Sequence, residues 1–500
     1  MTHRGRRPAA VLAALATLLS GALLTTTQAL PASAATVTPD LPTIDITLPS
    51  GVTQSTLDGG SKDTVYTGTT IAIDDPVNDA NDYTTPAGTG EIKGRGNYTW
   101  TLPKKPYQIK LDGSRPVLGM GSAKTWVLLA NAADASLMRN KVAYDLAASL
   151  GLPGSPDSRW VDLRINGQYR GNYLITEKVE VKTNRLELTD AQGILAELDR
   201  RGDGSQPGYP AEDYYFHSTT SGSTFTLKDS KSGTPDVVGD WDQDADTLAT
   251  KAGWDDMRAT LNKLDAALYA TTPSWTTISS IIDVDSFVKY YFVYELAENP
   301  EIVSSSVYFY KNGPADKLHI GPVWDFDSAL ANFDKSESLG ADYRSEYVKN
   351  ARELRGKYNG WQTQLFRNRA FVERANTLWK GGIAYHVSRL PSKIDGYYNT
   401  VKASAANNFQ KWQILGGPTL LTAGEGKTYA TTYYGEYSYL RNWVSQRETM
   451  LRKLYGDSPV VRARPYVQTY ARRPCVKTCA TRTGSASTIN ARSGSTTCSR

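Results

Sequence analysis

The stretch that most constrains the fold is residues 294–327, where a helix end and two short strand-like runs follow one another closely. Pro300 indicates that the helix has ended, because the residue before a proline is pushed out of helical geometry. The two runs, 307–311 and 318–323, are joined by a Gly-Pro turn, which is typical of a hairpin. This order predicts a helix, a short polar segment and two paired strands.

Two carboxylates, Asp325 and Asp327, come directly after the second run. If the strand continues through them they share a face at about 6–7 Å spacing, and such a pair can chelate a hard cation such as Mg²⁺. Glu301 and Ser306 precede the runs and add a carboxylate and a hydroxyl to the same region. The pattern is compatible with a phosphoryl-transfer site, but taken alone it favours the alternative that both aspartates cap the next turn or helix.

The two ends of the chain differ from the rest. Residues 1–34 combine a basic start, an apolar run and a small-residue cleavage site, and this predicts a secretory signal peptide. No other run approaches the ~20 apolar residues of a membrane span, so we expect a secreted protein with no membrane span in its mature chain. Residues 459–500 contain eight basic residues, no acid and all three cysteines, and they predict a disordered basic tail.

Charge argues against a nucleic-acid partner for the part between these ends. The formal net charge is +5, but both ends are basic and contain no acid, so residues 35–458 are mildly acidic. A nucleic-acid-binding domain typically shows a basic patch instead. We therefore expect one acidic, globular body at 35–458.

The body divides into a β-rich part at about 36–199 and a helical part at about 254–456, which makes it an α+β protein. Short strand-like runs fill the first part, with a meander expected at 159–199 around the Asn166-Gly167 hairpin signal. A nucleotide would lie in a cleft between the two parts. The expected helices are 136–150, 254–268, 284–298, 344–356, 369–380, 391–406 and 434–455.

Basic residues in the first part are candidates for phosphate contacts. Arg95 stands between two glycines and is followed by Asn97, an arrangement that allows close backbone approach to an anion, or simply a tight β-turn. Lys104 and Lys105 begin a strand at 104–111, where they either reach phosphates or lie on a solvated edge.

With these pieces placed, the chain resembles the spore-coat protein H (CotH) kinase family. The residues that carry the resemblance are KGRGNYTW (93–100), KKPYQIKL (104–111), WVLLANAADASLMRNKVAYDLAASLGLPGSP (126–156), WVDLRINGQYRGNYLITEKVEV (160–181), GILAELD (193–199), ENPEIVSSSVYFYK (298–311) and GPVWDFDSAL (321–330). The family implies a two-lobed atypical protein-kinase-like fold at 35–458, with ATP in the cleft and Mg²⁺, or alternatively Mn²⁺, at the acidic cluster.

The resemblance also implies roles for single residues. Protein kinases place a catalytic Asp five residues before a metal-binding Asn, and Glu301 and Ser306 keep that spacing with different side chains. Asp325 matches the metal-binding Asp before Phe, with Asp327 as a second ligand or orienting group. The residues implied at the nucleotide are Lys105 or Lys104 at the phosphates, Arg95 and Asn97 at the phosphate end, and Glu177 beside the adenine.

The function implied is transfer of the γ-phosphate of ATP to Ser or Thr of an unidentified acceptor protein. The alternative is a catalytically impaired nucleotide-binding pseudokinase or a structural/interaction protein, since Glu301 and Ser306 depart from the kinase pattern. A metal-dependent sugar-nucleotide transferase that uses the acidic pair is less favoured. A carbohydrate-binding surface built from the 30 tyrosines and 11 tryptophans is less favoured, because their spacing suits core packing.

Overall fold

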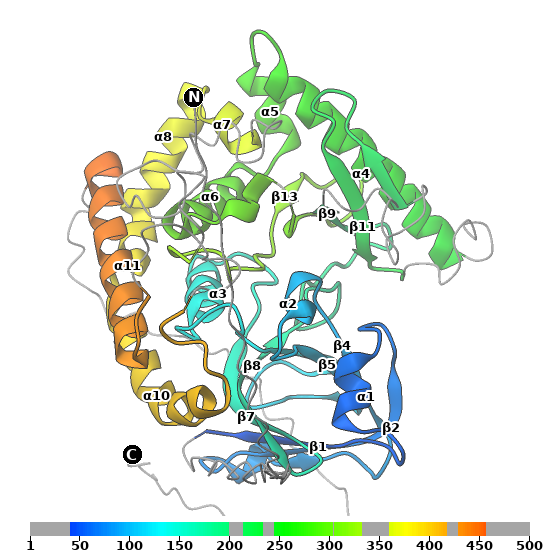
Figure 1. Cartoon of the computed structure of the whole chain (residues 1–500). Helices are drawn as coiled ribbons and strands as arrows, with labels where there is room; N and C mark the ends of the chain where they lie inside the picture. The colour runs from blue at the N-terminus through cyan, green and yellow to red at the C-terminus, as the bar shows by residue number, and fades with distance from the viewer. Residues whose placement is uncertain are drawn as a thin grey trace, which may run out of the picture. The chain divides into compact units, whose positions relative to one another are not determined.

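A computed structural model describes residues 41–199, 214–233, 245–303, 305–332, 360–417 and 429–456 (Figure 1). The expected signal peptide, the helix at 344–356 and the basic tail lie outside the described residues. The described residues are rich in strands toward the N-terminus and in helices toward the C-terminus, which confirms the mixed α+β class.

The N-terminal strands form an eight-stranded sheet in the order β1-β7-β8-β6-β5-β4-β2-β3. Strand β1 also pairs with β2, so seven of the strands close into a ring and β3 extends from β2. Closure leaves few unpaired strand edges. The strands are β1 (Thr43–Thr47), β2 (Tyr66–Asp74), β3 (Tyr83–Thr84), β4 (Gly90–Gly94), β5 (Tyr107–Arg115), β6 (Ala123–Leu129), β7 (Ser158–Ile165) and β8 (Gln168–Glu177).

Alternation of side chains along these strands fills the ring with its own core. Isoleucines at alternate positions of β1 and β2 are buried with Tyr107, Trp126 and Tyr173 from β5, β6 and β8. The hairpin between β7 and β8 turns at Asn166 and Gly167, whose φ angles of +49° and +74° suit a two-residue turn. The hairpin signal in the sequence is therefore confirmed.

A second, five-stranded antiparallel sheet has the order β10-β11-β9-β12-β13. Its strands are β9 (Ile194–Leu198), β10 (Tyr215–His217), β11 (Thr224–Ser230), β12 (Val307–Lys311) and β13 (His319–Ile320). The expected meander at 159–199 is wrong in its last part, because β9 pairs with β11 and β12 rather than with β8. The expected meander also lacks a strand at 187–189. Just before these residues, Leu186 forms an isolated bridge with Val181.

Helices surround the second sheet and continue to the end of the described chain. Those expected at 254–268, 284–298, 369–380, 391–406 and 434–455 are all present with shifted ends. Asp283 caps α6 (Val284–Ala297), accepting a hydrogen bond of 2.8 Å from the Ser286 N–H. The helices are α1 (Gln54–Gly59), α2 (Tyr98–Thr101), α3 (Arg139–Ser149), α4 (Ala245–Tyr269), α5 (Trp275–Ile281), α6 (Val284–Ala297), α7 (Trp361–Leu365), α8 (Arg369–Leu378), α9 (Ala384–Ser388), α10 (Leu390–Lys411) and α11 (Tyr433–Tyr455).

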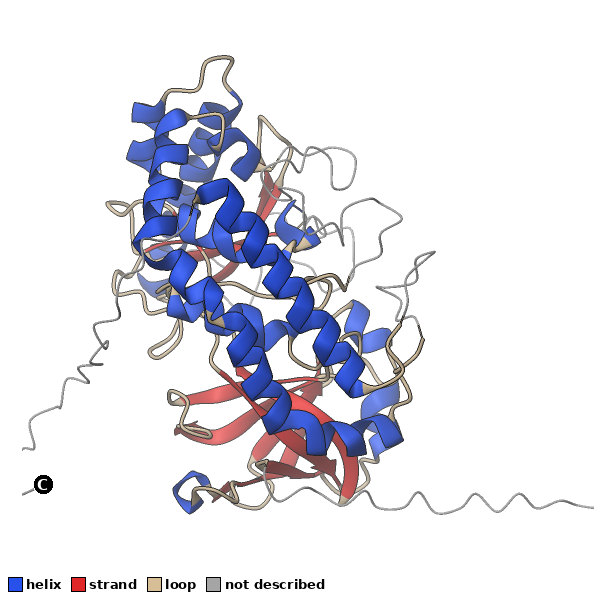
Figure 2. Cartoon of the chain, turned by 90° about the vertical axis from the view of Figure 1, so that its left-hand side faces the viewer, coloured by secondary structure: helices blue, strands red, loops and turns tan. Residues whose placement is uncertain are grey.

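Helix α6 is the centre of the helical part, because nearly all of its residues are buried. The two long helices α10 and α11 lie side by side, and α10 also packs on β8 of the first sheet (Figure 2). No helix among the described residues combines the length and the apolar character needed to cross a membrane.

The strand expected to carry the two aspartates ends early. Strand β13 contains only His319 and Ile320, and Pro322 follows, which has no N–H to continue the ladder. Asp325 has a φ angle of +63°, in the left-handed region rather than the extended one. The prediction that Asp325 and Asp327 share a strand face is therefore wrong, and both residues lie in a loop.

Candidate functional site

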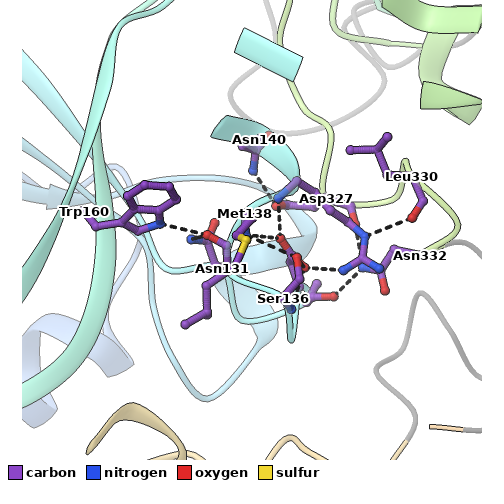
Figure 3. Close-up of polar contacts among 12 residues, drawn as sticks. Asn131, Ser136, Met138, Asn140, Trp160, Asp327, Leu330 and Asn332 are labelled. Carbon is purple, nitrogen blue, oxygen red and sulfur yellow. Dashed lines mark hydrogen bonds and ion pairs between the residues drawn. The ribbon is translucent and has the colours of Figure 1, made fainter. Parts of the chain in front are cut away.

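The loop formed by residues 325–332, called the acidic loop below, is held by the first turn of α3. The carboxamide of Asn140 donates a 2.6 Å hydrogen bond to Asp327 Oδ1 and accepts one of 2.8 Å from the Phe326 N–H. Figure 3 shows Asn140 pointing at Asp327 from the helix. One buried side chain thus contacts both the backbone and a carboxylate of the acidic loop.

The start of α3 is itself fixed by a buried ion pair. The Asp134 carboxylate accepts from the N–H groups of Met138 and Arg139 at 3.1 and 2.9 Å, and it pairs with the Arg139 guanidinium. Arg139 Nε also donates to the Leu330 carbonyl at 3.3 Å. Asn332 also connects the acidic loop to the segment before α3. Its Nδ2 donates to the carbonyls of Ala133 and Asp327 at 2.7 and 2.6 Å (Figure 3).

The other side of the acidic loop meets the segment that follows α6. Ser306 Oγ lies 3.4 Å from Asp325 Oδ2, and Asn299 Nδ2 donates to the Asp325 carbonyl at 2.9 Å. Ser306 and Asp325 both have left-handed backbone, with φ angles of +58° and +63°. Such conformations in non-glycine residues are often found at functional sites.

Arg95 supplies the positive charge facing this loop. Its guanidinium lies 5.1 Å from the centre of the Trp324 ring. Burial lowers the pKa of Arg95, while Asp325 and Asp327 act in the opposite direction and stabilise its charged form. The loop that carries Arg95 needs its glycines for internal packing: a Cβ on Gly96 would lie 2.1 Å from Thr99 Oγ1.

Burial and like charge dominate the electrostatics of Asp327. Burial raises the pKa of the Asp327 carboxyl to about 8, with further upward contributions from Asp325 and Asp134. The Asn140 hydrogen bond and the Arg95 charge lower it in part. Each of the two carboxylates makes the charged form of the other less favourable. A bound divalent cation would reduce this repulsion.

Glu301 lies in the 3₁₀ turn η3 (Pro300–Val303), directly after α6. Its N–H donates to Asn299 Oδ1 at 2.9 Å, and its carboxylate accepts a hydrogen bond from the Ser305 hydroxyl. Glu301 and Asp325 both raise the pKa of the buried Tyr294 hydroxyl, after the larger effect of burial. Both carboxylates therefore act electrostatically on the same hydroxyl group.

The two candidate lysines have other partners than the acidic loop. Lys104 is buried, and its ammonium donates to the Asn172 carbonyl and to Asn408 Oδ1, between β8 and α10. Burial lowers the pKa of Lys104 well below its ordinary value. Lys105 Nζ donates to the Trp100 carbonyl at 2.5 Å.

The remaining residues implied at the nucleotide lie in two places. Glu177, the last residue of β8, pairs with Arg185 at 2.5 Å and accepts from the Asp157 N–H at 3.0 Å. Asn97 is exposed and directly precedes α2, two residues after Arg95. Of the sequence-predicted residues, the structure places Ser306 beside Asp325, and it places Arg95 over the ring of Trp324, the residue before Asp325.

The acidic loop offers few side-chain ligands for a metal ion, but their chemical type suits Mg²⁺. Within the described ranges, no group of three or more His, Cys, Asp or Glu side chains gathers as a metal site. Mg²⁺, however, is commonly held by one or two carboxylates together with substrate phosphates. Asp325 and Asp327, with the Ser306 hydroxyl beside Asp325, fit a cation that is completed by a nucleotide.

Sequence reasoning missed the asparagines that hold the acidic loop. Asn140 and Asn299 contact it from two other segments, and Asn332, within the loop, ties it to Ala133. The only signal in the sequence is that Asn140 follows Arg139 at a helix start, inside one of the runs that carry the family resemblance. Nothing in a local pattern indicates a contact to a residue 187 positions away.

A helix end, a polar turn, two short strands and the acidic loop thus follow one another in this part of the α+β chain. A family model described as CotH kinase protein matches residues 92–451. The match covers well over half of the chain, so the chain belongs to the CotH kinase protein family. A comparison with curated proteins found no significant match.

Proposed function

We propose that this chain is a secreted atypical protein kinase that transfers the γ-phosphate of ATP to Ser or Thr of an acceptor protein, with Mg²⁺ as cofactor. The observation that carries the proposal is that Ser306 lies beside Asp325, two residues before Asp327, while Arg95 lies over the ring of the adjacent Trp324. A cation from the strand-rich part and two carboxylates from the helical part offer opposite charges to one metal–phosphate group. Membership in a kinase family supports the same reaction class.

The chemistry asked of the chain is mainly positioning and charge neutralisation. Bound Mg²⁺ would neutralise phosphate charge, held by Asp325 and Asp327. Arg95 would contact the phosphates, because its guanidinium already faces the acidic loop. Glu301 would accept the proton of the acceptor hydroxyl, as it now accepts a hydrogen bond from the hydroxyl of Ser305.

Export is the second component of the proposal, and it is supported by the composition of residues 1–34. The acceptor would then be a protein that the kinase meets during or after export. Lys105 and Glu177 are kept as nucleotide contacts in the proposal, on the strength of the family resemblance. Lys104 is better explained as a structural residue, because its ammonium is buried against α10.

One observation favours a second candidate, a pseudokinase that binds the nucleotide without transferring phosphate. Glu301 and Ser306 occupy positions where kinases use Asp and Asn. In addition, Ser305 hydrogen-bonds to the Glu301 carboxylate and so occupies a position that an acceptor hydroxyl would need. Nucleotide binding without turnover would identify this alternative.

The test is self-labelling and acceptor labelling by γ-labelled ATP in the presence of Mg²⁺ or Mn²⁺. We expect the wild type to incorporate label. Glu301→Gln should bind ATP normally but lose incorporation by about 100-fold or more, which begins at the lower end of the range for a general base. Equal incorporation by both proteins would exclude Glu301 as the proton acceptor.

The same assay separates the remaining alternatives. ATP binding with no incorporation in the wild type would support the pseudokinase. Thermal stabilisation by nucleotide sugars and not by ATP would support the sugar-nucleotide transferase and would contradict the kinase proposal.

A further inference from the structure

We infer that Asn140 is a positioning residue that sets the direction in which Asp327 presents its carboxylate to the metal. The inference rests on the proposed function, because it concerns the same candidate site. It adds a residue of α3 that the sequence pattern did not single out.

The two ends of the Asn140 carboxamide make different contacts. Nδ2 donates to Asp327 Oδ1 at 2.6 Å, while Oδ1 accepts from the Phe326 N–H at 2.8 Å. Asn140 is 2% exposed, so these contacts are shielded from water. Only a side chain with both a donor and an acceptor can make this pair of bonds, which excludes Asp, Lys and every apolar residue.

The helix turn that carries Asn140 is rigidly held. Asp134 accepts from two N–H groups of the turn, and Trp160 Nε1 donates to the Leu137 carbonyl at 2.9 Å. Asn140 therefore fixes the position of the acidic loop relative to α3. Side chains that orient a metal ligand in this way fix its geometry and increase metal affinity.

Asn332 offers a matched control in the same loop. It is also buried, and it holds the loop by two hydrogen bonds, but both go to backbone carbonyls and neither touches a carboxylate. Removing either asparagine should loosen the loop. Only the removal of Asn140 should free the Asp327 carboxylate to rotate.

The experiment measures Mn²⁺ binding in the presence of ATP, from the EPR signal of free Mn²⁺, together with the melting temperature without metal. We expect Asn140→Ala to weaken Mn²⁺ binding by about 10- to 100-fold, the usual effect of losing a residue that orients a ligand. Asn332→Ala should lower the melting temperature to a similar extent and leave the Mn²⁺ affinity unchanged. Asn140→Ser, which keeps one hydroxyl contact, should be intermediate.

The outcomes separate this inference from the proposed function. Mn²⁺ binding by the wild type together with unchanged affinity in Asn140→Ala would overturn the positioning role alone. Equal losses of affinity in the Asn140 and Asn332 variants would also overturn it, because they would indicate a merely structural role. A wild type that binds no Mn²⁺ with ATP would overturn the proposed function and this inference with it. If Asn140→Ala does not fold, Asn140→Ser decides by the same comparison with Asn332→Ala.

Discussion

Asp325 shows how one residue can meet several segments at once. Its carbonyl accepts from Asn299, its carboxylate lies beside Ser306, and its charge acts on Arg95. Asp325 makes these contacts from a loop, where its backbone is in the left-handed region. In a strand its side chain would point in a different direction. The carboxylate is thus placed by tertiary contacts from before and after it in the chain.

Removing this carboxylate should abolish the response to nucleotide without unfolding the protein. We expect Asp325→Ala to lose the thermal stabilisation that Mg²⁺ and ATP give to the wild type, because one of the two metal-binding carboxylates is gone. Its melting temperature without ligand should stay close to that of the wild type. Normal stabilisation by Mg²⁺ and ATP in the variant would rule out Asp325 as a metal ligand.

Helix α11 supports the end of α6, which leads into the segment that contains Glu301. Arg447 of α11 is fully buried, and it donates to the Glu295 carbonyl at 3.1 and 2.6 Å. It also pairs with the buried carboxylates of Glu295 and, at 3.1 Å, of Glu298. Glu295 lies in the last turn of α6, and Glu298 caps it with a φ angle of +46°. The end of α6, and with it Glu301 three residues later, is therefore tied to α11.

Removing the Arg447 side chain should strongly destabilise the fold. We expect Arg447→Ala to lower the free energy of unfolding by about 3–5 kcal/mol, because it leaves two buried carboxylates without their cation. Arg369→Ala on α8, which removes an exposed pair with Glu373, is the matched control and should cost about 0.5 kcal/mol or less. Denaturant unfolding of the two variants measures both values, and equal small losses would contradict the structural role of Arg447.

Across the whole molecule, a buried polar network joins the first sheet to α10. Lys104, Asn172 and Asn408 meet there although they are separated by up to 304 residues. Gly171 of β8 allows the close approach: its φ angle is +114°, and a Cβ there would lie 2.6 Å from Asn408 Oδ1. The contact between strand and helix therefore depends on a residue without a side chain.

Adding a methyl group at this position should separate the two elements. We expect Gly171→Ala to destabilise the protein by about 2–5 kcal/mol, from an unfavourable backbone conformation together with overpacking. Gly167→Ala is the control, because Gly167 has a φ angle of +74° but no atom within 4 Å of an added Cβ. Its loss should be smaller, and thermal or denaturant unfolding of both variants would show the difference. Equal losses would mean that backbone strain alone explains Gly171.

Local patterns predicted the elements better than their partners. The helices around residues 284–298 and 434–455 follow from apolar periodicity and caps, and the turn at Asn166-Gly167 follows from its two left-handed residues. The pairing of β9 failed because a short apolar run fits either sheet equally well. The strand expected through Asp325 failed because Pro322 stops the ladder and leaves a loop.

By itself the sequence determined the α+β class, most helices and the chemical groups of the candidate site, because these depend on neighbours a few residues apart. Tertiary structure alone decided that Arg95 lies over Trp324 beside the acidic loop while Lys104 contacts α10, and that Asn140 holds Asp327. The physical reason is the range of the interactions. A hydrogen bond or an ion pair across 187 or more residues exists only after the intervening chain has packed, and it leaves no periodic trace in the sequence.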